Sequence, residues 1–271
     1  MMVHTIAALL AVACSSTGPT APRCAEPAPA GDYMYTFRAT GEGSDDPTSG
    51  TVRVHGDRIR IDMDRKNSDN NGYILITGDR MMSVRPDRKE VSEMSAPKFE
   101  HIIGVSLRAV SPMVKFNVSN AMISSERAGA GQQMLGYATE HVRMTEKFDV
   151  HIVALGFDAG TEHYSIVTDY WVSPGLELGA NPLLALLERT SSAMAQTDAG
   201  FVQKEATVRA DALKGTPLRT VVNESNIDEK GVRHSKTRSI DITSLRIGPQ
   251  APALFKVPSG YRIKSGMDFS R

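Results

Sequence analysis

Apolar and charged residues alternate through residues 50–64, whose sequence is GTVRVHGDRIRIDMD. Because a β-strand turns successive side chains to opposite faces, this alternation predicts two strands, 51–55 and 58–64. The Gly56-Asp57 pair between them predicts a tight turn and therefore an antiparallel hairpin. One face of the hairpin collects Val52, Val54, Ile59, Ile61 and Met63. We expect this face to be buried, with charged side chains pairing across the strands on the other face.

Further strand patterns flank the hairpin and are separated by turns rich in Gly, Pro, Asn and Asp. A strand from Tyr33 precedes it, and a meander of short strands follows it to about residue 91. Strands are also expected at 114–118, 121–125, 133–145, 148–155, 163–172, 218–224, 238–245 and 261–263. Strands of this length predict a twisted, largely antiparallel sheet.

Three segments have helical patterns. Ser95-Ala96-Pro97 precedes apolar residues at helical spacing, and Asn181-Pro182 precedes the apolar run 183–188. A third stretch runs from about Asp198 to Lys214-Gly215, where a glycine can end a helix. A sheet with one apolar face needs a cover, and helices are the expected cover. The sequence therefore predicts an α+β fold, in which a single curved, mostly antiparallel sheet covers two or three α-helices.

The first 32 residues differ from the rest of the chain. Residues 6–13, IAALLAVA, form a short apolar run before Cys14, which is typical of an export signal. AVA fits a signal-peptidase site, while LAVAC resembles a bacterial lipobox in which Cys14 would carry a lipid. Residues 15–32, rich in Pro, Ala, Ser and Thr, predict a tether, and residues 33–271 predict one folded domain. We therefore expect an exported protein, either periplasmic or anchored to the outer membrane as a lipoprotein.

Charge and motif content exclude several classes of function. Lys plus Arg and Asp plus Glu both total 31, so no net field attracts nucleic acid or an anionic membrane. Membrane contact is then expected only through an N-terminal lipid. Both cysteines, Cys14 and Cys24, precede the folded body, and the seven histidines form no zinc motif. A nucleophile elbow and a phosphate-binding loop are also missing. We therefore expect no catalytic residue, no metal and no cofactor.

Four motifs carry a resemblance to a known family. They are GDRIRID at 56–62, VRPDRK at 84–89, LGYAT at 135–139 and LFKVPSGY at 254–261. The chain resembles exported bacterial proteins of the domain of unknown function numbered 4412, whose sheets look like the half-barrel of lipoprotein carriers such as LolA. The resemblance implies a LolA-like half-barrel from residue 33 onward. Its apolar concave face receives lipid acyl chains in the carriers, but the family implies no established activity.

These observations favour a non-enzymatic, exported protein that binds an apolar ligand, such as a lipid or acyl chain, in the concavity of the sheet. The candidate ligand-binding residues are Val54, Ile59, Ile61, Met63, Met82 and Trp171. One alternative is a closed-core structural module whose charged face binds an envelope protein. Another is a hydrolase built from scattered histidines and carboxylates. A continuous apolar cavity would favour the ligand-binding protein, and a solid core would favour the structural module. A polar cleft with a His and a carboxylate would favour the hydrolase.

Overall fold

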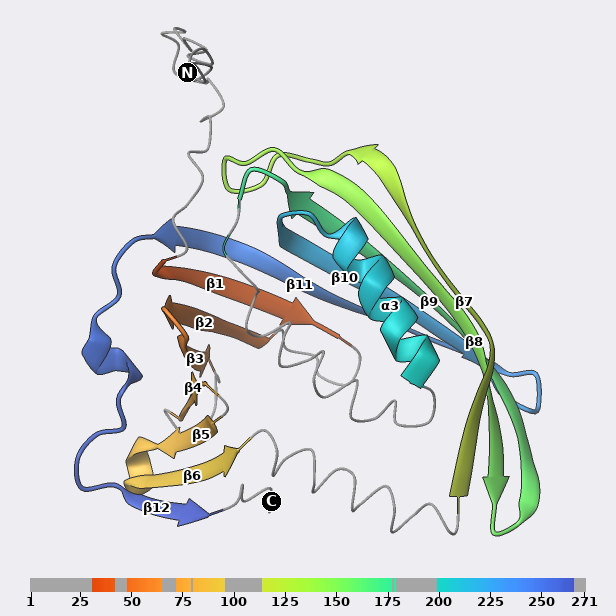
Figure 1. Cartoon of the computed structure of the whole chain (residues 1–271), viewed down its shortest axis with the longest axis horizontal. Helices are drawn as coiled ribbons and strands as arrows, with labels where there is room; N and C mark the ends of the chain where they lie inside the picture. The colour runs from red at the N-terminus through yellow and green to blue at the C-terminus, as the bar shows by residue number, and fades with distance from the viewer. Residues whose placement is uncertain are drawn as a thin grey trace, which may run out of the picture.

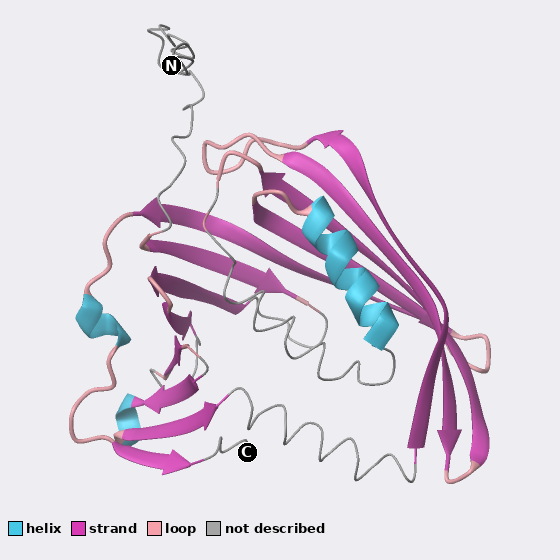
Figure 2. Cartoon of the chain, in the orientation of Figure 1, coloured by secondary structure: helices cyan, strands magenta, loops and turns pink. Residues whose placement is uncertain are grey.

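The computed structural model of the chain describes residues 31–41, 48–64, 72–78, 80–95, 114–176, 178 and 199–265. Within them, a single curved sheet dominates the molecule (Figure 1), and little of the described chain is helical (Figure 2). The predicted signal peptide, Cys14 and nearly all of the predicted tether lie outside the described residues.

The described strands form one twelve-stranded sheet, in the order β12-β6-β5-β4-β3-β2-β1-β11-β10-β9-β8-β7. The shorter strands are β1 Tyr33–Thr40, β2 Thr48–His55, β3 Arg58–Asp64, β4 Tyr73–Thr77, β5 Arg80–Arg85, β6 Glu90–Ser95 and β12 Arg262–Ser265. The longer strands are β7 Val114–Ala130, β8 Glu140–Ala154, β9 Phe157–Ser173, β10 Thr216–Ile227 and β11 Arg233–Ile247. Two 3-10 turns are η1 Pro86–Arg88 and η2 Pro252–Phe255. The pairing is antiparallel except between β12 and β6, which are parallel.

One face of the sheet can be followed through the strand register from β8 to β1. Val142 stands opposite Tyr170, Tyr170 opposite Thr220, Thr220 opposite Ile240, and Ile240 opposite Ala39. We call this the inner face, and the opposite one the outer face. The helix α3, Ala199–Ala212, packs on the inner face against the long strands (Figure 1).

The hairpin predicted from the alternating segment is confirmed. β2 and β3 pair antiparallel, and the turn between them places Gly56 at a positive φ of 59°. The apolar residues of both strands face inward, as expected. On the outer face Arg53 and Arg60 stand directly opposite each other, and the Asp62 carboxylate forms ion pairs with both. This placement relieves the repulsion that two facing cations would otherwise have.

The predicted fold class is wrong. α3 confirms the helix expected from about residue 198, but it is the one α-helix among the described residues, and the described chain is mostly sheet. It is therefore not an α+β fold in which two or three helices cover a half-barrel. The helices expected after Ser95 and at 183–188 lie outside the described residues, and Ser95 itself ends β6.

The physical reason is that the sheet has a second apolar side, on the outer face, from β4 onward. Tyr73 and Leu75 of β4 stand opposite the outer-facing residues of β3, so their side chains point outward. They form an outer cluster with Val84 and Val91. The C-terminal segment covers this cluster with Val257 and Tyr261, and it then adds β12 to the sheet edge. An irregular segment thus provides a cover that the sequence pattern assigned to helices.

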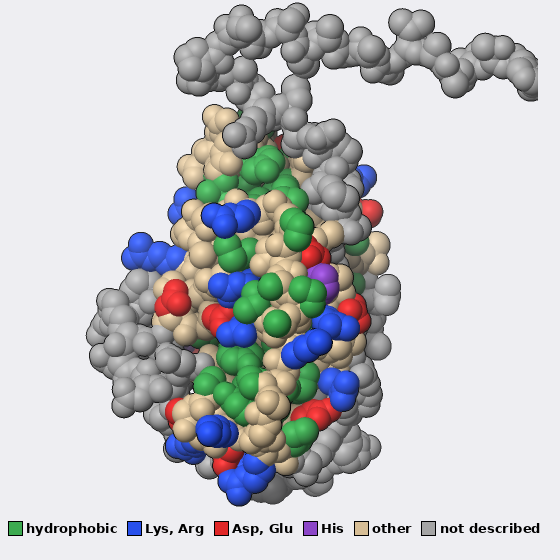
Figure 3. All heavy atoms as spheres, turned by 90° about the vertical axis from the view of Figure 1, so that its left-hand side faces the viewer, with side chains coloured by type: hydrophobic (Ala, Val, Ile, Leu, Met, Phe, Trp, Pro, Cys, Tyr) green, Lys and Arg blue, Asp and Glu red, His purple; other side chains and the backbone are tan. Residues whose placement is uncertain are grey.

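The side of the molecule along which the C-terminal segment runs has a mixed surface. Apolar, basic and acidic side chains alternate there without a large area of one sign (Figure 3). This distribution agrees with the equal numbers of acidic and basic residues in the sequence.

Candidate functional site

Four of the six predicted ligand-binding residues lie together on the inner face. Val54, Ile59 and Ile61 are buried in one apolar cluster, and Met63 packs against it. The buried members of this inner cluster are Tyr33, Tyr35, Phe37, Val52, Val54, Ile59, Ile61, Leu176, Leu178, Leu218 and Ile242. The predicted residues thus belong to a larger apolar surface drawn from strands far apart in the sequence.

A short segment after β9 packs onto this inner cluster through Leu176 and Leu178. The buried hydroxyl of Thr216 fixes the segment, because its Oγ1 donates to the Leu176 carbonyl oxygen at 2.5 Å and accepts from the Leu178 backbone N–H at 3.2 Å. Because this hydroxyl both donates and accepts a hydrogen bond, its burial leaves no polar group unsatisfied. The segment is therefore an integral part of the inner cluster.

The other two predicted residues lie on the outer face. Met82 stands opposite Leu75 and packs with the outer cluster of β4, β5 and β6. Trp171 alternates along β9 with Tyr170 and Val172, which are buried on the inner face. The structure therefore divides the predicted set between two faces and does not bring all six residues to one site.

Trp171 has a cross-strand neighbour on each side. The His141 ring stacks on it with ring centroids 4.8 Å apart, and the Arg219 guanidinium lies 5.1 Å from its centroid. The Asp169 carboxylate accepts a hydrogen bond from Arg143 Nε at 2.9 Å and lies 2.7 Å from His141 Nε2. Stacking and charge pairing of this kind stabilise a sheet face, and they place the Trp171 indole between the His141 ring and the Arg219 guanidinium.

A second inner cluster lies beneath α3. Val208, Ala212 and Leu213 pack on Ile123, Val142, Met144, Tyr170 and Val172. Of the residues from the helix and its end, Ala212 is buried, while Val208 and Leu213 are only partly buried. Among the helix side chains that the structure describes, the apolar contact with the sheet is therefore small.

Charged groups complete the contact between α3 and the sheet. Glu146 of β8 is 7% exposed, and its Oε1 lies 4.0 Å from Arg209 Nη2 of the helix. Arg209 also pairs with Glu205 one turn earlier and interacts with Tyr170. Burial and the nearby Glu205 carboxylate raise the pKa of Glu146 to about 7, against the opposing effect of Arg209. A carboxyl with such a pKa changes charge near neutrality.

Sequence reasoning missed Glu146, although a signal for it was present. Val142, Met144 and Glu146 occupy alternate positions, so one strand face carries all three. A carboxylate following two apolar residues on a buried face is the kind of group whose pKa burial raises. The alternation alone does not show that α3 would supply Glu205 and Arg209 above it.

A metal centre is not evident in the part of the chain that the structure describes. There, no group of three or more His, Cys, Asp or Glu side chains is arranged to hold a metal ion. The same described residues contain no helix that is long and apolar enough to span a membrane.

No family model matches the chain, and no curated protein sequence does. Among solved structures, the chain is similar to an uncharacterized conserved protein from Thermus thermophilus, with 10% identity and a TM-score of 0.38. That similarity covers 87% of this chain and 91% of the other. At this TM-score the similarity carries no argument about function or family.

Proposed function

We propose that the chain is an exported, non-enzymatic binding protein that takes up an apolar ligand, such as a lipid or acyl chain, on the inner face of the sheet. α3 is the displaceable cover in this proposal. The observation that carries it is the contact between α3 and the sheet, where, among the helix side chains that the structure describes, Ala212 is buried and Val208 only partly buried against a largely apolar face.

The energetics of α3 favour a cover that can open. A fully buried Val or Leu side chain stabilises by roughly 1.5–3 kcal/mol, and here both Val208 and Leu213 are only partly buried. The buried Glu146 carboxyl opposes docking when it is ionised, because Arg209 Nη2 remains 4.0 Å away. A helix held by a few kcal/mol opens often enough to admit a guest.

The alternative proposal is a closed-core module of the cell envelope that binds a protein partner and no apolar ligand. A specific observation favours it: Val54, Ile59 and Ile61 are between 2% and 8% exposed, so the inner cluster is already well packed. The two proposals differ in whether α3 leaves the sheet.

Native mass spectrometry with lipid extraction, on the full chain purified from a bacterial host, tests the proposal. Stoichiometric co-purified lipid is expected. Hydrogen exchange of the α3 amides should also change when that lipid is removed, while exchange of β2 and β3 should not. A protein that stays unliganded when challenged with phospholipids and fatty acids contradicts the proposal and favours the closed core.

A matched pair of variants locates the ligand. Ala212→Leu enlarges a side chain buried between α3 and the sheet, whereas Ala210→Leu makes the same change at an exposed position of the helix. We expect Ala212→Leu to reduce co-purified lipid severalfold and Ala210→Leu to leave it unchanged. Equal lipid content in both variants would place the ligand elsewhere.

A further inference from the structure

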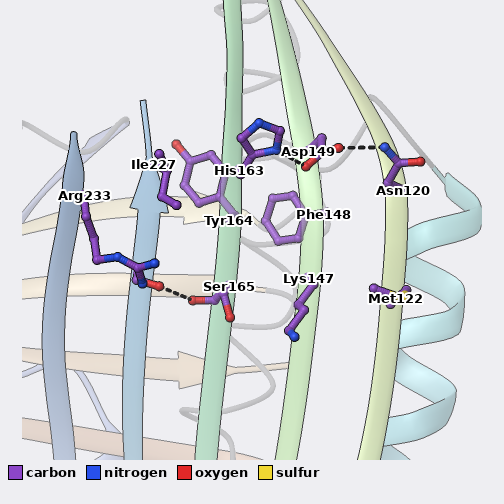
Figure 4. Close-up of a pocket in the computed structure, with 11 residues that line it drawn as sticks. Asn120, Met122, Lys147, Phe148, Asp149, His163, Tyr164, Ser165, Ile227 and Arg233 are labelled. Atoms are coloured by element: carbon purple, nitrogen blue, oxygen red, sulfur yellow. Dashed lines mark hydrogen bonds and ion pairs between the residues drawn. The ribbon is translucent and has the colours of Figure 1, made fainter. Parts of the chain in front are cut away.

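A groove of about 300 Å³ lies on the outer face of the long strands, away from α3 (Figure 4). Its floor is formed where Lys147 of β8 stands opposite Ser165 of β9, and Ser165 stands opposite Ser225 of β10. The two serine side chains are short, so the surface dips between the longer side chains around them. Its volume is at the lower end of the range for small-molecule sites.

Two cations border this floor from opposite sides. In Figure 4, Arg233 of β11 reaches over β10 toward Ser165, and the amine end of Lys147 lies on the other side of Ser165. Both side chains are exposed, and within the described residues neither makes an ion pair or a side-chain hydrogen bond. Arg53, Arg60 and Arg143 of the outer face, in contrast, each have a carboxylate partner.

The carboxylate that lines the groove is engaged on both of its oxygens. Asp149 Oδ1 lies 2.6 Å from His163 Nδ1, and Oδ2 accepts a hydrogen bond from Asn120 Nδ2 at 2.7 Å. These hydrogen bonds hold the pKa of the Asp149 carboxyl below its usual value. The Asp149 carboxylate therefore stays ionised, and the two cations Lys147 and Arg233 outnumber it around the serine floor.

We propose that this groove binds a tetrahedral oxyanion group of the phosphate type, with Lys147 and Arg233 as its cationic contacts and the Ser165 hydroxyl as a neutral donor. The Ser225 hydroxyl beside it donates to the Ser165 carbonyl oxygen at 3.4 Å (Figure 4). Arg matches phosphate with a planar fork of N–H donors, and Lys supplies a compact charge from the other side. A hydroxyl donor between them suits a ligand whose acceptor oxygens point in several directions. This site is on the opposite face from the proposed apolar ligand and does not depend on it.

Titration of the full chain with inorganic phosphate at low ionic strength tests the proposal, read by calorimetry and by the amide resonances of β8 to β11. Saturable binding is expected, with shifts centred on Ser165 and Ser225. Arg233→Gln and Lys147→Gln should each weaken the affinity at least about fivefold. Arg246→Gln is the matched control, because Arg246 is an exposed residue at the other end of β11 without a partner among the described residues. Thermal unfolding of each variant confirms that it is folded.

A phosphate group can belong to a soluble compound or to a lipid head group, and binding to vesicles distinguishes the two. Phosphate binding without vesicle binding identifies a soluble phosphate compound. Binding to phosphatidylglycerol vesicles but not to phosphatidylcholine vesicles, lost in Arg233→Gln, identifies a lipid head group. Either result supports the site. Lack of saturable binding in both arms overturns the proposal, and so does an equal loss of affinity in Arg246→Gln, which would indicate a general effect of net charge.

Discussion

Glu146 shares one side of β8 with Val142 and Met144, so the strand carries its carboxyl beneath α3 together with them. Burial and two neighbours on α3 then determine its chemistry: burial and Glu205 oppose its ionisation, and Arg209 favours it. The same side chain on the outer face would remain in water at its ordinary pKa. The sequence near Glu146 thus predicts which strand face carries it, while its charge state depends on the helix packed above that face.

Glu146→Gln should remove a pH dependence of stability. The folded pKa is about 7 against an ordinary value of 4.5, so between these values the folded state holds a proton that the unfolded state has lost. The free energy of unfolding should therefore fall as pH rises from 4.5 to 7 and then level off, by about 3 kcal/mol in all. Urea denaturation at pH 5 and pH 8 measures this difference.

The variant should be more stable than the unaltered chain at pH 8 and similar to it at pH 5. Glu140→Gln, which changes a more exposed carboxylate of the same strand, is the control and should keep the pH slope. If Glu146→Gln retains the full slope, another group is responsible for it.

Gly50 illustrates a constraint of space at the residue scale. A Cβ added there would lie 2.5 Å from the Asp62 backbone oxygen and 2.9 Å from Phe37 Cε1. Because the backbone of β3 is held by its pairing and Phe37 is buried, neither can easily move. We expect Gly50→Ala to lower the free energy of unfolding by about 1–3 kcal/mol. At Gly41 an added Cβ meets only the flexible Arg238 side chain, so Gly41→Ala should cost little by the same urea measurement.

At the scale of elements, the strand patterns were largely sufficient. The hairpin of β2 and β3 and the helix α3 were predicted from turn residues and periodicity, which act within a few residues. Several boundaries were wrong: the strands expected at 133–145 and 148–155 form one strand, β8, which begins only at Glu140, and 114–118 and 121–125 are parts of one strand, β7. Asn120 adopts a φ of 53° at a bulge, so the strand continues through a position that resembles a break.

The C-terminal segment is an element whose role no local pattern revealed. Phe255 of η2 is 4% exposed and stacks on His55, with ring centroids 5.5 Å apart, and the Leu254 carbonyl oxygen accepts from Arg60 Nη1 at 3.2 Å. These contacts hold the segment on the outer face before it reaches β6. The covered apolar cluster would otherwise be exposed at the end of the sheet.

Phe255→Ala should loosen this cover. Removal of a buried aromatic ring is expected to lower stability by roughly 3 kcal/mol, and hydrogen exchange in β12 should accelerate because the segment leading to it is released. The exposed neighbour Lys256 provides the control, since Lys256→Ala changes no buried contact. Unchanged exchange in β12 after Phe255→Ala would show that the parallel pairing with β6 alone retains the strand.

On the scale of the whole molecule, the pairing of β1 with β11 joins the short N-terminal strands to the long ones. The register runs from Tyr33 opposite Ile247 to Thr40 opposite Ser239. The sheet is thus continuous, and the inner cluster takes residues from both parts. The inner cluster is therefore incomplete in either part alone.

Unfolding should therefore occur in one transition. The fluorescence of Trp171, the only tryptophan, reports on β9, and far-ultraviolet circular dichroism reports on the entire sheet. Both signals should follow the same urea curve. Two separated transitions would show that the parts on either side of the β1–β11 pairing unfold independently.

Most strands, the turn of the β2–β3 hairpin and the helix α3 follow from the sequence alone, because alternation, turn chemistry and helix ends depend on residues close along the chain. Only the tertiary structure decided which face of each strand is buried and what covers it. Met82 and Trp171 follow the same alternation as Ile59 and Ile61, yet they point to the outer face. Burial depends on which distant segment packs against a strand, and that contact is not encoded in the period of the strand itself.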